Sequence, residues 1–338
     1  MAFTGIAATL GALASVEIAC RILGDRLPEP VTWAHPTIQV KAEQLARLER
    51  AGERPDIVFL GDSISYIGID PDEVDGALPP GAVSYNAAVG FGTPQVMEMW
   101  WRHVLAALHP QTVVYGITPT SVNDLSSLDV LDHDRARATQ PGLTGRLRRA
   151  VAGSSAAVSC AGALLDAGNR QVLWSRVAGR GGSTTLQKLR AATGPRGNRR
   201  PLRAITDAEF DQQLPDLLSG FRVGGIKLGA FERTLAGLAG EGVEVVVALL
   251  PFSPRAHQRY RALGGDPWAT GVAAIRRAAQ AQGAAFVDVS GGLGDEHFAD
   301  PIHPGPEGVA RLSRRLGRAL AERSTRSAGD GRQSAAGA

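Results

Sequence analysis

The chain has 338 residues, of which 44% are hydrophobic and 20% charged, a balance typical of a globular protein with a full core. Its two cysteines, Cys20 and Cys160, are too few for a disulfide framework and stand in no metal-ligand spacing, so the sequence indicates no metal and no cofactor. The formal net charge of +3 is uneven, because residues 141–203 carry twelve Lys and Arg against one acid. No nucleic-acid-binding motif accompanies this basic stretch, which argues against a nucleic-acid partner.

The chain begins with an apolar segment, Ala2 to Ala19, that contains a single charge, Glu17. As a helix this segment would be about 27 Å long, close to the hydrocarbon thickness of a bilayer. We therefore predict a membrane anchor over residues 1–23, with a cleaved signal peptide or a buried core helix as the alternatives. A Pro-rich linker and a leading helix are expected over residues 24–55.

Short apolar segments then alternate with segments of helical spacing, which is the pattern of βαβ units. The expected strands cover Ile57 to Leu60, Ala82 to Tyr85, Thr112 to Ile117, Val243 to Leu250 and Ala285 to Val289. The expected helices cover Pro94 to Leu108, Ile226 to Ala239, Pro267 to Gln282 and Gly305 to Glu322. Unbroken apolar strands are typical of parallel sheets buried on both faces, so we predict an α/β, flavodoxin-like three-layer domain of about five parallel strands over residues 56–323.

Residues 125–225 interrupt this alternation and are too long for an ordinary loop. We predict that they form a helical insertion or cap over the site, with mobile joints at Gly179 to Ser183 and at Gly194 to Asn198. Residues 324–338 are rich in Ser, Gly and Ala and lack apolar periodicity, which predicts a disordered tail.

The segment DIVFLGDSISY, Asp56 to Tyr66, places Ser63 where a buried strand gives way to a new element. Gly61 permits a sharp turn, Asp62 is expected to order it, and the N–H groups of a helix start would face an anion forming beside Ser63. These features predict a nucleophile at Ser63. The alternative is that Ser63 only caps the following helix.

A serine nucleophile needs a base, and Asp300 with His303 can supply one. A carboxylate three residues before an imidazole can accept its Nδ1–H and leave Nε2 free for Ser63. The alternative base is His297 with Asp295, which lack this three-residue spacing.

Four blocks in chain order carry a resemblance to a known family. They are Gly61-Asp62-Ser63, Asn86 to Gly90, Asn123-Asp124 and Asp300 to His303. Together they resemble the blocks of the SGNH (GDSL-type) hydrolases. The resemblance implies a serine hydrolase of ester bonds in which Gly90 N–H and the Asn123 amide join Ser63 N–H in holding the oxyanion. Asn123 could instead be a turn residue, and Gly90 a loop glycine.

The same resemblance implies an acyl ester as the substrate, either an O-acylated carbohydrate or a lipid. Two alternatives stay open: an O-acyltransferase that modifies a cell-envelope polysaccharide, and a non-catalytic envelope assembly or carbohydrate-binding protein with the same fold. Membrane-anchored bacterial members of the family imply a catalytic domain outside the cytoplasm. Arg21 and Arg26, which follow the apolar segment, favour the opposite orientation by the positive-inside rule.

Overall fold

The computed structural model describes residues 2–23, 35–126, 155–157, 160–161, 170–172, 175, 183–217 and 220–335. The predicted linker and most of the segment from 127 to 182 lie outside these residues. Contacts divide the chain into two compact units, one of residues 1–40 and 135–192 and the other of residues 41–134 and 193–338. The helical insertion predicted over residues 125–225 stays a prediction, since most of residues 127–182 lie outside the described residues.

In the first unit, α1 (Ala2–Leu23) occupies the predicted apolar segment. Among the described residues, no helix combines the length and the apolarity needed to cross a membrane, so the predicted transmembrane anchor is not supported. The predicted placement of the remaining chain outside the cytoplasm stays a prediction.

Glu17 of α1 has a structural role within the first unit. Its carboxylate accepts hydrogen bonds from Ala157 N–H, Ala156 N–H and Ser155 Oγ, each at 2.9 Å. These bonds, led by that from Ala157, lower the pKa of Glu17 to about 2. The helix α10 (Thr185–Ala192) also belongs to this unit.

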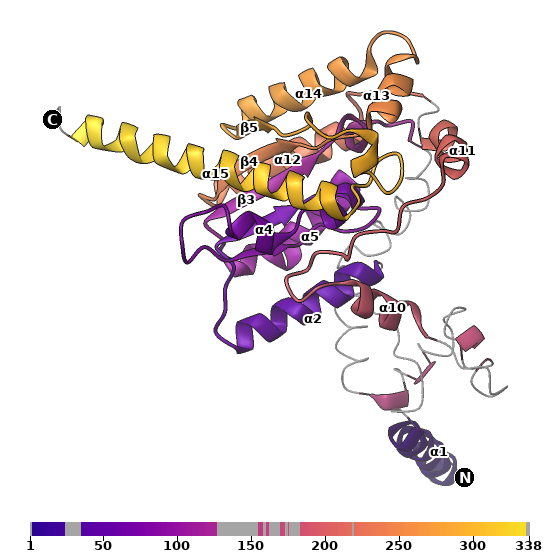
Figure 1. The fold of residues 1–338 in the computed structure, drawn as a ribbon. Helices are drawn as coiled ribbons and strands as arrows, with labels where there is room; N and C mark the ends of the chain where they lie inside the picture. Colours follow the sequence, from indigo (N-terminus) through magenta and orange to yellow (C-terminus); the bar gives the residue numbers. More distant parts are fainter. Residues whose placement is uncertain are drawn as a thin grey trace. The chain divides into compact units, whose positions relative to one another are not determined.

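The second unit contains the five-stranded parallel sheet that the sequence predicts (Figure 1). Its strands are β1 (Ile57–Leu60), β2 (Ser84–Asn86), β3 (Thr112–Ile117), β4 (Glu244–Leu249) and β5 (Ala285–Asp288). They follow the order β2-β1-β3-β4-β5, which is the flavodoxin-like order. Beyond their first residues β1, β3 and β4 are buried, as expected for strands covered on both faces. The fold prediction is confirmed.

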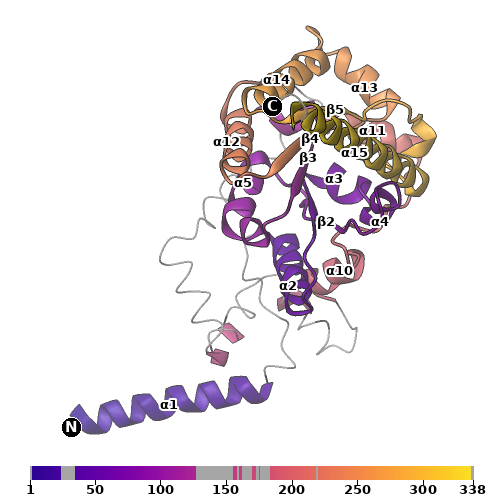
Figure 2. The ribbon, with the colours of Figure 1, turned by 90° about the vertical axis from the view of Figure 1, so that its left-hand side faces the viewer.

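Helices cover both faces of this sheet (Figure 2). One face carries α5 (Pro94–His103), α12 (Ile226–Gly240) and α14 (Pro267–Ala281). There the rings of Tyr115 and Phe231 meet edge to face, with 5.0 Å between their centroids. The other face carries α3 (Ser63–Gly68), α4 (Pro71–Asp75) and α15 (Pro306–Ala335). There Phe59 and Val114 of the sheet belong to one buried cluster with Leu312 of α15.

Further elements connect these layers. They are η2 (Leu105–Leu108), η3 (Pro119–Val122), α11 (Asp207–Leu217), α13 (Pro254–Arg261) and η5 (Asp295–His297). A further helix, α2 (Pro36–Arg50), spans the boundary between the two units. α2 precedes β1 in the sequence, at the position where the leading helix is predicted.

The last helix is longer than the sequence predicts. α15 continues through Ala335, whereas the expected helix ends at Glu322, and residues 336–338 lie outside the described residues. Extending an existing helix adds one backbone hydrogen bond for each residue ordered, without a new nucleation cost. The disordered tail predicted for residues 324–338 stays a prediction.

The segment Gly194 to Asn198, predicted as a mobile joint, is a hydrogen-bonded turn in the structure. Gly194 N–H donates to Asn198 O at 2.7 Å, which closes a tight turn. Asn86 N–H at the end of β2 donates to Arg196 O at 2.8 Å, and the buried Lys41 ammonium donates to Gly197 O. The glycines serve close packing here rather than mobility, since a Cβ on Gly197 would lie 2.2 Å from Asn86 O. The other predicted joint, Gly179 to Ser183, lies almost wholly outside the described residues.

Candidate active site

The turn after β1 presents Ser63 as the first residue of α3. Gly61 has a φ of 142°, and a Cβ there would lie 2.1 Å from Ser65 Oγ and 2.5 Å from Gly116 O, so only glycine fits. Asp62 is the N-cap of α3, and its Oδ1 accepts the N–H of Ile64 at 2.9 Å. These contacts agree with the expectation that Asp62 orders the turn. They leave the hydroxyl of Ser63 half-exposed beyond the carboxyl end of the strand.

Before α15, a second tight turn holds Asp300 and His303. Ala299 N–H donates to His303 O at 2.9 Å, which closes the turn. Inside it, Asp300 Oδ1 accepts the N–H groups of Ile302 at 3.0 Å and of His303 at 2.8 Å. These two backbone hydrogen bonds orient the Asp300 carboxylate independently of its contact with the His303 imidazole.

The structure joins the two turns through His303. Its Nδ1 lies 2.7 Å from Asp300 Oδ2, and its Nε2 lies 2.8 Å from Ser63 Oγ. The three residues that the sequence predicts as nucleophile, base and orienting acid thus form one hydrogen-bonded line. This is the geometry required for an imidazole to take the serine proton while a carboxylate holds its tautomer.

The electrostatics of Asp300 suit that role. Burial pushes the pKa of its carboxyl upward, but the hydrogen bond and charge of His303, with the Ile302 and His303 N–H donors, outweigh it and hold the pKa below its usual value. Asp300 is therefore an anion at neutral pH. Only 13% of its side chain and 15% of that of His303 are exposed, which limits the screening of their interaction by water.

The candidate oxyanion donors Ser63 N–H and Gly90 N–H lie on loops that contact each other. Val89 N–H donates to Gly61 O at 3.0 Å, which fastens the loop after β2 to the nucleophile turn. Within the described residues, neither Ser63 N–H nor Gly90 N–H donates to a protein acceptor. Both groups remain available to an oxygen atom beside Ser63.

The structure places Asn123 in a different setting. Its Oδ1 accepts the N–H groups of Arg222 at 2.9 Å and Leu125 at 3.1 Å, and its Nδ2 donates to Gly220 O at 2.7 Å. The side chain is fully buried and fastens the loop after η3 to residues 220–222. Among the described contacts none joins Asn123 to Ser63 or His303, which favours the turn residue over the oxyanion donor.

Two long-range contacts near the nucleophile turn are not evident from the sequence. Ser121 Oγ donates to Asp62 Oδ2 at 2.7 Å, across 59 residues of chain. Lys227 donates its ammonium to Asn123 O, and burial lowers its pKa to about 8, although the carboxylates of Asp124 and Asp62 act in the opposite direction. Burial also raises the pKa of Asp62. No local spacing in the sequence signals either contact, because each joins distant segments.

His297, the alternative base, is not beside Ser63 in any described contact. Its Nδ1 accepts Gly294 N–H at 3.1 Å, and its Nε2 lies 3.9 Å from a carboxylate oxygen of Glu307. The ring is buried and holds the turn before Asp300. Among the described residues no group of three or more His, Cys, Asp or Glu side chains is arranged to hold a metal ion.

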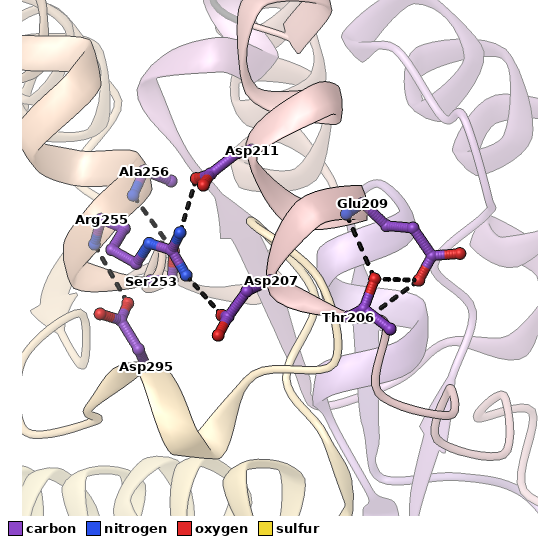
Figure 3. A network of polar contacts seen from close by, with 8 residues as sticks. All are labelled: Thr206, Asp207, Glu209, Asp211, Ser253, Arg255, Ala256 and Asp295. Carbon is purple, nitrogen blue, oxygen red and sulfur yellow. Dashed lines mark hydrogen bonds and ion pairs between the residues drawn. The ribbon is translucent and has the colours of Figure 1, made fainter.

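Arg255, close to the Asp300 turn, ties three segments together (Figure 3). Its guanidinium donates to Asp207 at 2.8 Å and to Asp211 at 2.5 Å, both on α11, and its backbone N–H donates to Asp295 at 3.1 Å. It also lies over the ring of Phe210, 4.4 Å from the centroid. α11 and η5 are therefore fastened to the start of α13.

The same region supports the turn directly. Ser253 N–H donates to Pro301 O at 3.2 Å, and Ile205 N–H, just before α11, donates to Ala299 O at 2.9 Å. Ser253 Oγ also caps α13 by accepting Ala256 N–H at 3.2 Å (Figure 3). Backbone bonds on both sides thus position Asp300 and His303.

Neither the family models nor the sequences of curated proteins give a match to the chain. Similar solved structures include a lipase/acylhydrolase from Enterococcus faecalis, 14% identical over 80% of this chain and 96% of that chain, with a TM-score of 0.40. A GDSL-like lipase from Bacteroides thetaiotaomicron is 13% identical over 84% of this chain and 98% of that chain, with a TM-score of 0.40. A carbohydrate acetylesterase from Sinorhizobium meliloti is 10% identical over 80% and 99% of the two chains, with a TM-score of 0.37.

Proposed function

We propose that the chain is a serine esterase that cleaves an acyl ester through a covalent acyl-enzyme. The observation that carries this proposal is the continuous line from Asp300 Oδ2 through both ring nitrogens of His303 to Ser63 Oγ, with distances of 2.7 and 2.8 Å. A serine that only capped α3 would not need an imidazole on its hydroxyl. Here Asp62 already caps the helix.

The chemistry follows from these contacts. His303 Nε2 takes the proton of Ser63 Oγ as that oxygen bonds to the ester carbonyl carbon, and Asp300 stabilises the imidazolium that forms. The carbonyl oxygen becomes an anion that Ser63 N–H and Gly90 N–H can hold. Collapse of this intermediate returns the proton from His303 to the leaving alcohol, and water then repeats the sequence to release the acid.

A fluorophosphonate probe tests this proposal, because it phosphonylates only an activated serine. The full chain should gain the mass of one phosphonyl group, and peptide mapping should place it on Ser63. Ser63→Ala and His303→Ala should both prevent labelling, and both should reduce turnover of an aryl acetate to near background. Labelling that persists in Ser63→Ala would refute the esterase proposal.

The identity of the acyl acceptor is measured separately on the same enzyme. With an aryl acetate as donor, release of acetate in water alone supports hydrolysis. An acetylated oligosaccharide that forms only when the sugar is added would indicate the transferase alternative. A folded protein that binds a sugar and neither labels nor turns over would indicate the non-catalytic alternative.

A further inference from the structure

A cavity away from Ser63 is lined by an unusual concentration of arginine. It lies between α15 and the loop that leaves β5, and its volume is about 210 Å³. The lining residues are Val289, Gly292, Leu293, Arg311, Leu312, Arg314, Arg315 and Arg318. Four arginines therefore line one small cavity, and no acidic residue is among its lining residues.

Helix geometry explains why the arginines converge. Arg311, Arg314, Arg315 and Arg318 follow the spacing i, i+3, i+4 and i+7, which places them on one face of α15. Beside this face, Leu312 and Leu316 pack into the core. A row of arginines on a solvated face would be unremarkable, but here the loop after β5 forms a second wall.

The charges at this cavity are only half neutralised. Arg311 donates to Glu307 at 2.6 Å, and Arg314 donates to Glu73 at 3.0 Å. Within the described part of the chain, no carboxylate lies at ion-pair distance from Arg315 or Arg318. Two positive charges thus remain without an acidic partner beside the cavity, and they would repel each other unless an anion joins them.

The loop is shaped to hold Arg315 against the cavity. The Arg315 guanidinium donates to Gly291 O, which uses one of its five N–H donors. Gly292 has a φ of 77°, and a Cβ there would lie 2.5 Å from Nη2 of Arg315. The glycine therefore permits both the turn and the close approach of the guanidinium. Arg315 is half-buried and oriented, whereas Arg318 is exposed.

We propose that this arginine cavity binds a phosphate group. Guanidinium forks match the oxygens of phosphate, and hydrogen bonds between charged groups are about twice as strong as neutral ones. The cavity is smaller than the roughly 300–1,000 Å³ that holds a whole small molecule, so it fits a head group rather than a complete ligand. The phosphate can belong to a soluble phosphoester or to a phospholipid head group.

The test is a titration of the full chain in low-salt chloride buffer. Inorganic phosphate and glycerol phosphate are added in separate calorimetric experiments, and a third arm measures sedimentation with vesicles of phosphatidylcholine with and without phosphatidic acid. The variants are Arg315→Gln, Arg318→Gln and the double variant. Arg277→Gln is the matched control, since it removes an exposed arginine from α14, away from this cavity.

Wild type and the Arg277→Gln control should bind phosphate saturably at one site. Each single variant should weaken binding about tenfold or more, and the double variant should abolish it. Binding that depends on Arg315 and Arg318 only in the phosphatidic acid arm supports the proposal with a lipid as the source of the phosphate. Equal binding by wild type and the double variant, or no binding by wild type in any arm, overturns it.

Arg318 is exposed, so replacing it should leave the fold intact and still test the contribution of the cavity to phosphate binding. If the double variant unfolds, Arg318→Gln alone decides, because its side chain has no acidic partner among the described residues. Arg318→Lys keeps the charge and should restore part of the affinity. Because binding is measured directly, Ser63→Ala should bind phosphate like wild type, so the outcome does not depend on the esterase proposal.

Discussion

Replacing Asp300 by Asn changes the hydrogen-bonding preference of His303 with almost no change in side-chain shape. The asparagine carbonyl oxygen can satisfy the N–H groups of Ile302 and His303, now 3.0 and 2.8 Å from Oδ1, only if its NH₂ faces His303 Nδ1. A donor at that position requires Nδ1 to be an acceptor. The ring proton then moves to Nε2, which can no longer take the proton of Ser63.

The size of the effect follows from counting hydrogen bonds. Turning the amide over would restore the productive tautomer but would oppose two backbone N–H groups with an NH₂, at a cost of roughly 1–3 kcal/mol. That term alone reduces the productive form by about 5- to 150-fold. Asp300→Asn also removes the negative charge that stabilises the imidazolium of His303. The unfavourable tautomer and the lost charge together should lower kcat by up to about 10⁴-fold, equivalent to about 5.5 kcal/mol in the barrier.

The assay is turnover of an aryl acetate from pH 5 to pH 9, with the rate of fluorophosphonate labelling as an independent readout. Asp295→Asn and His297→Ala are matched controls on the same segment, because neither residue touches Ser63 or His303 in any described contact. Both controls should stay within about threefold of wild type. If Asp300→Asn keeps more than about one tenth of the wild-type kcat, the tautomer argument is wrong.

Three further outcomes are expected. Asn123→Ala should lower the free energy of unfolding in urea by about 2 kcal/mol, because the buried N–H groups of Leu125 and Arg222 lose their acceptor, while kcat changes less than about threefold. A 10²- to 10³-fold loss of kcat would instead identify an oxyanion donor. Phe91→Gly should raise the free energy of unfolding by up to about 1 kcal/mol, since Phe91 has a φ of 57° and is 63% exposed; a fall would contradict the strain. The folded-state pKa of Asp300 lies below its unfolded value, so its stabilisation is complete above about pH 4 and is lost as the pH falls through the folded-state value. Urea denaturation from pH 5 to pH 2 should therefore show a steeper loss for wild type than for Asp300→Asn, and parallel curves would contradict this.

The sequence by itself determined the features that depend on neighbours a few residues apart. The expected strand Thr112 to Ile117 matches β3 residue for residue, because period and apolarity are local properties. The contact between Asp300 and His303 was predictable for the same reason, since a three-residue turn brings carboxylate and imidazole together whatever surrounds them. The order of the blocks along the chain also indicated that Ser63 and His303 would meet at one end of a parallel sheet.

Tertiary structure alone decided which distant groups each polar side chain contacts. Ser63 and His303 are 240 residues apart, and only the strand order and the two turns set their distance at 2.8 Å. Asn123 could be an oxyanion donor or a turn residue by sequence, and the partners that favour the turn residue, Gly220 and Arg222, lie 97 and 99 residues away along the chain. Local spacing reaches about one helical turn, whereas a buried hydrogen-bonding group takes its partner from whichever segment packs against it. Roles that depend on such long-range partners therefore follow from the packing of the whole domain and not from any short segment of the chain.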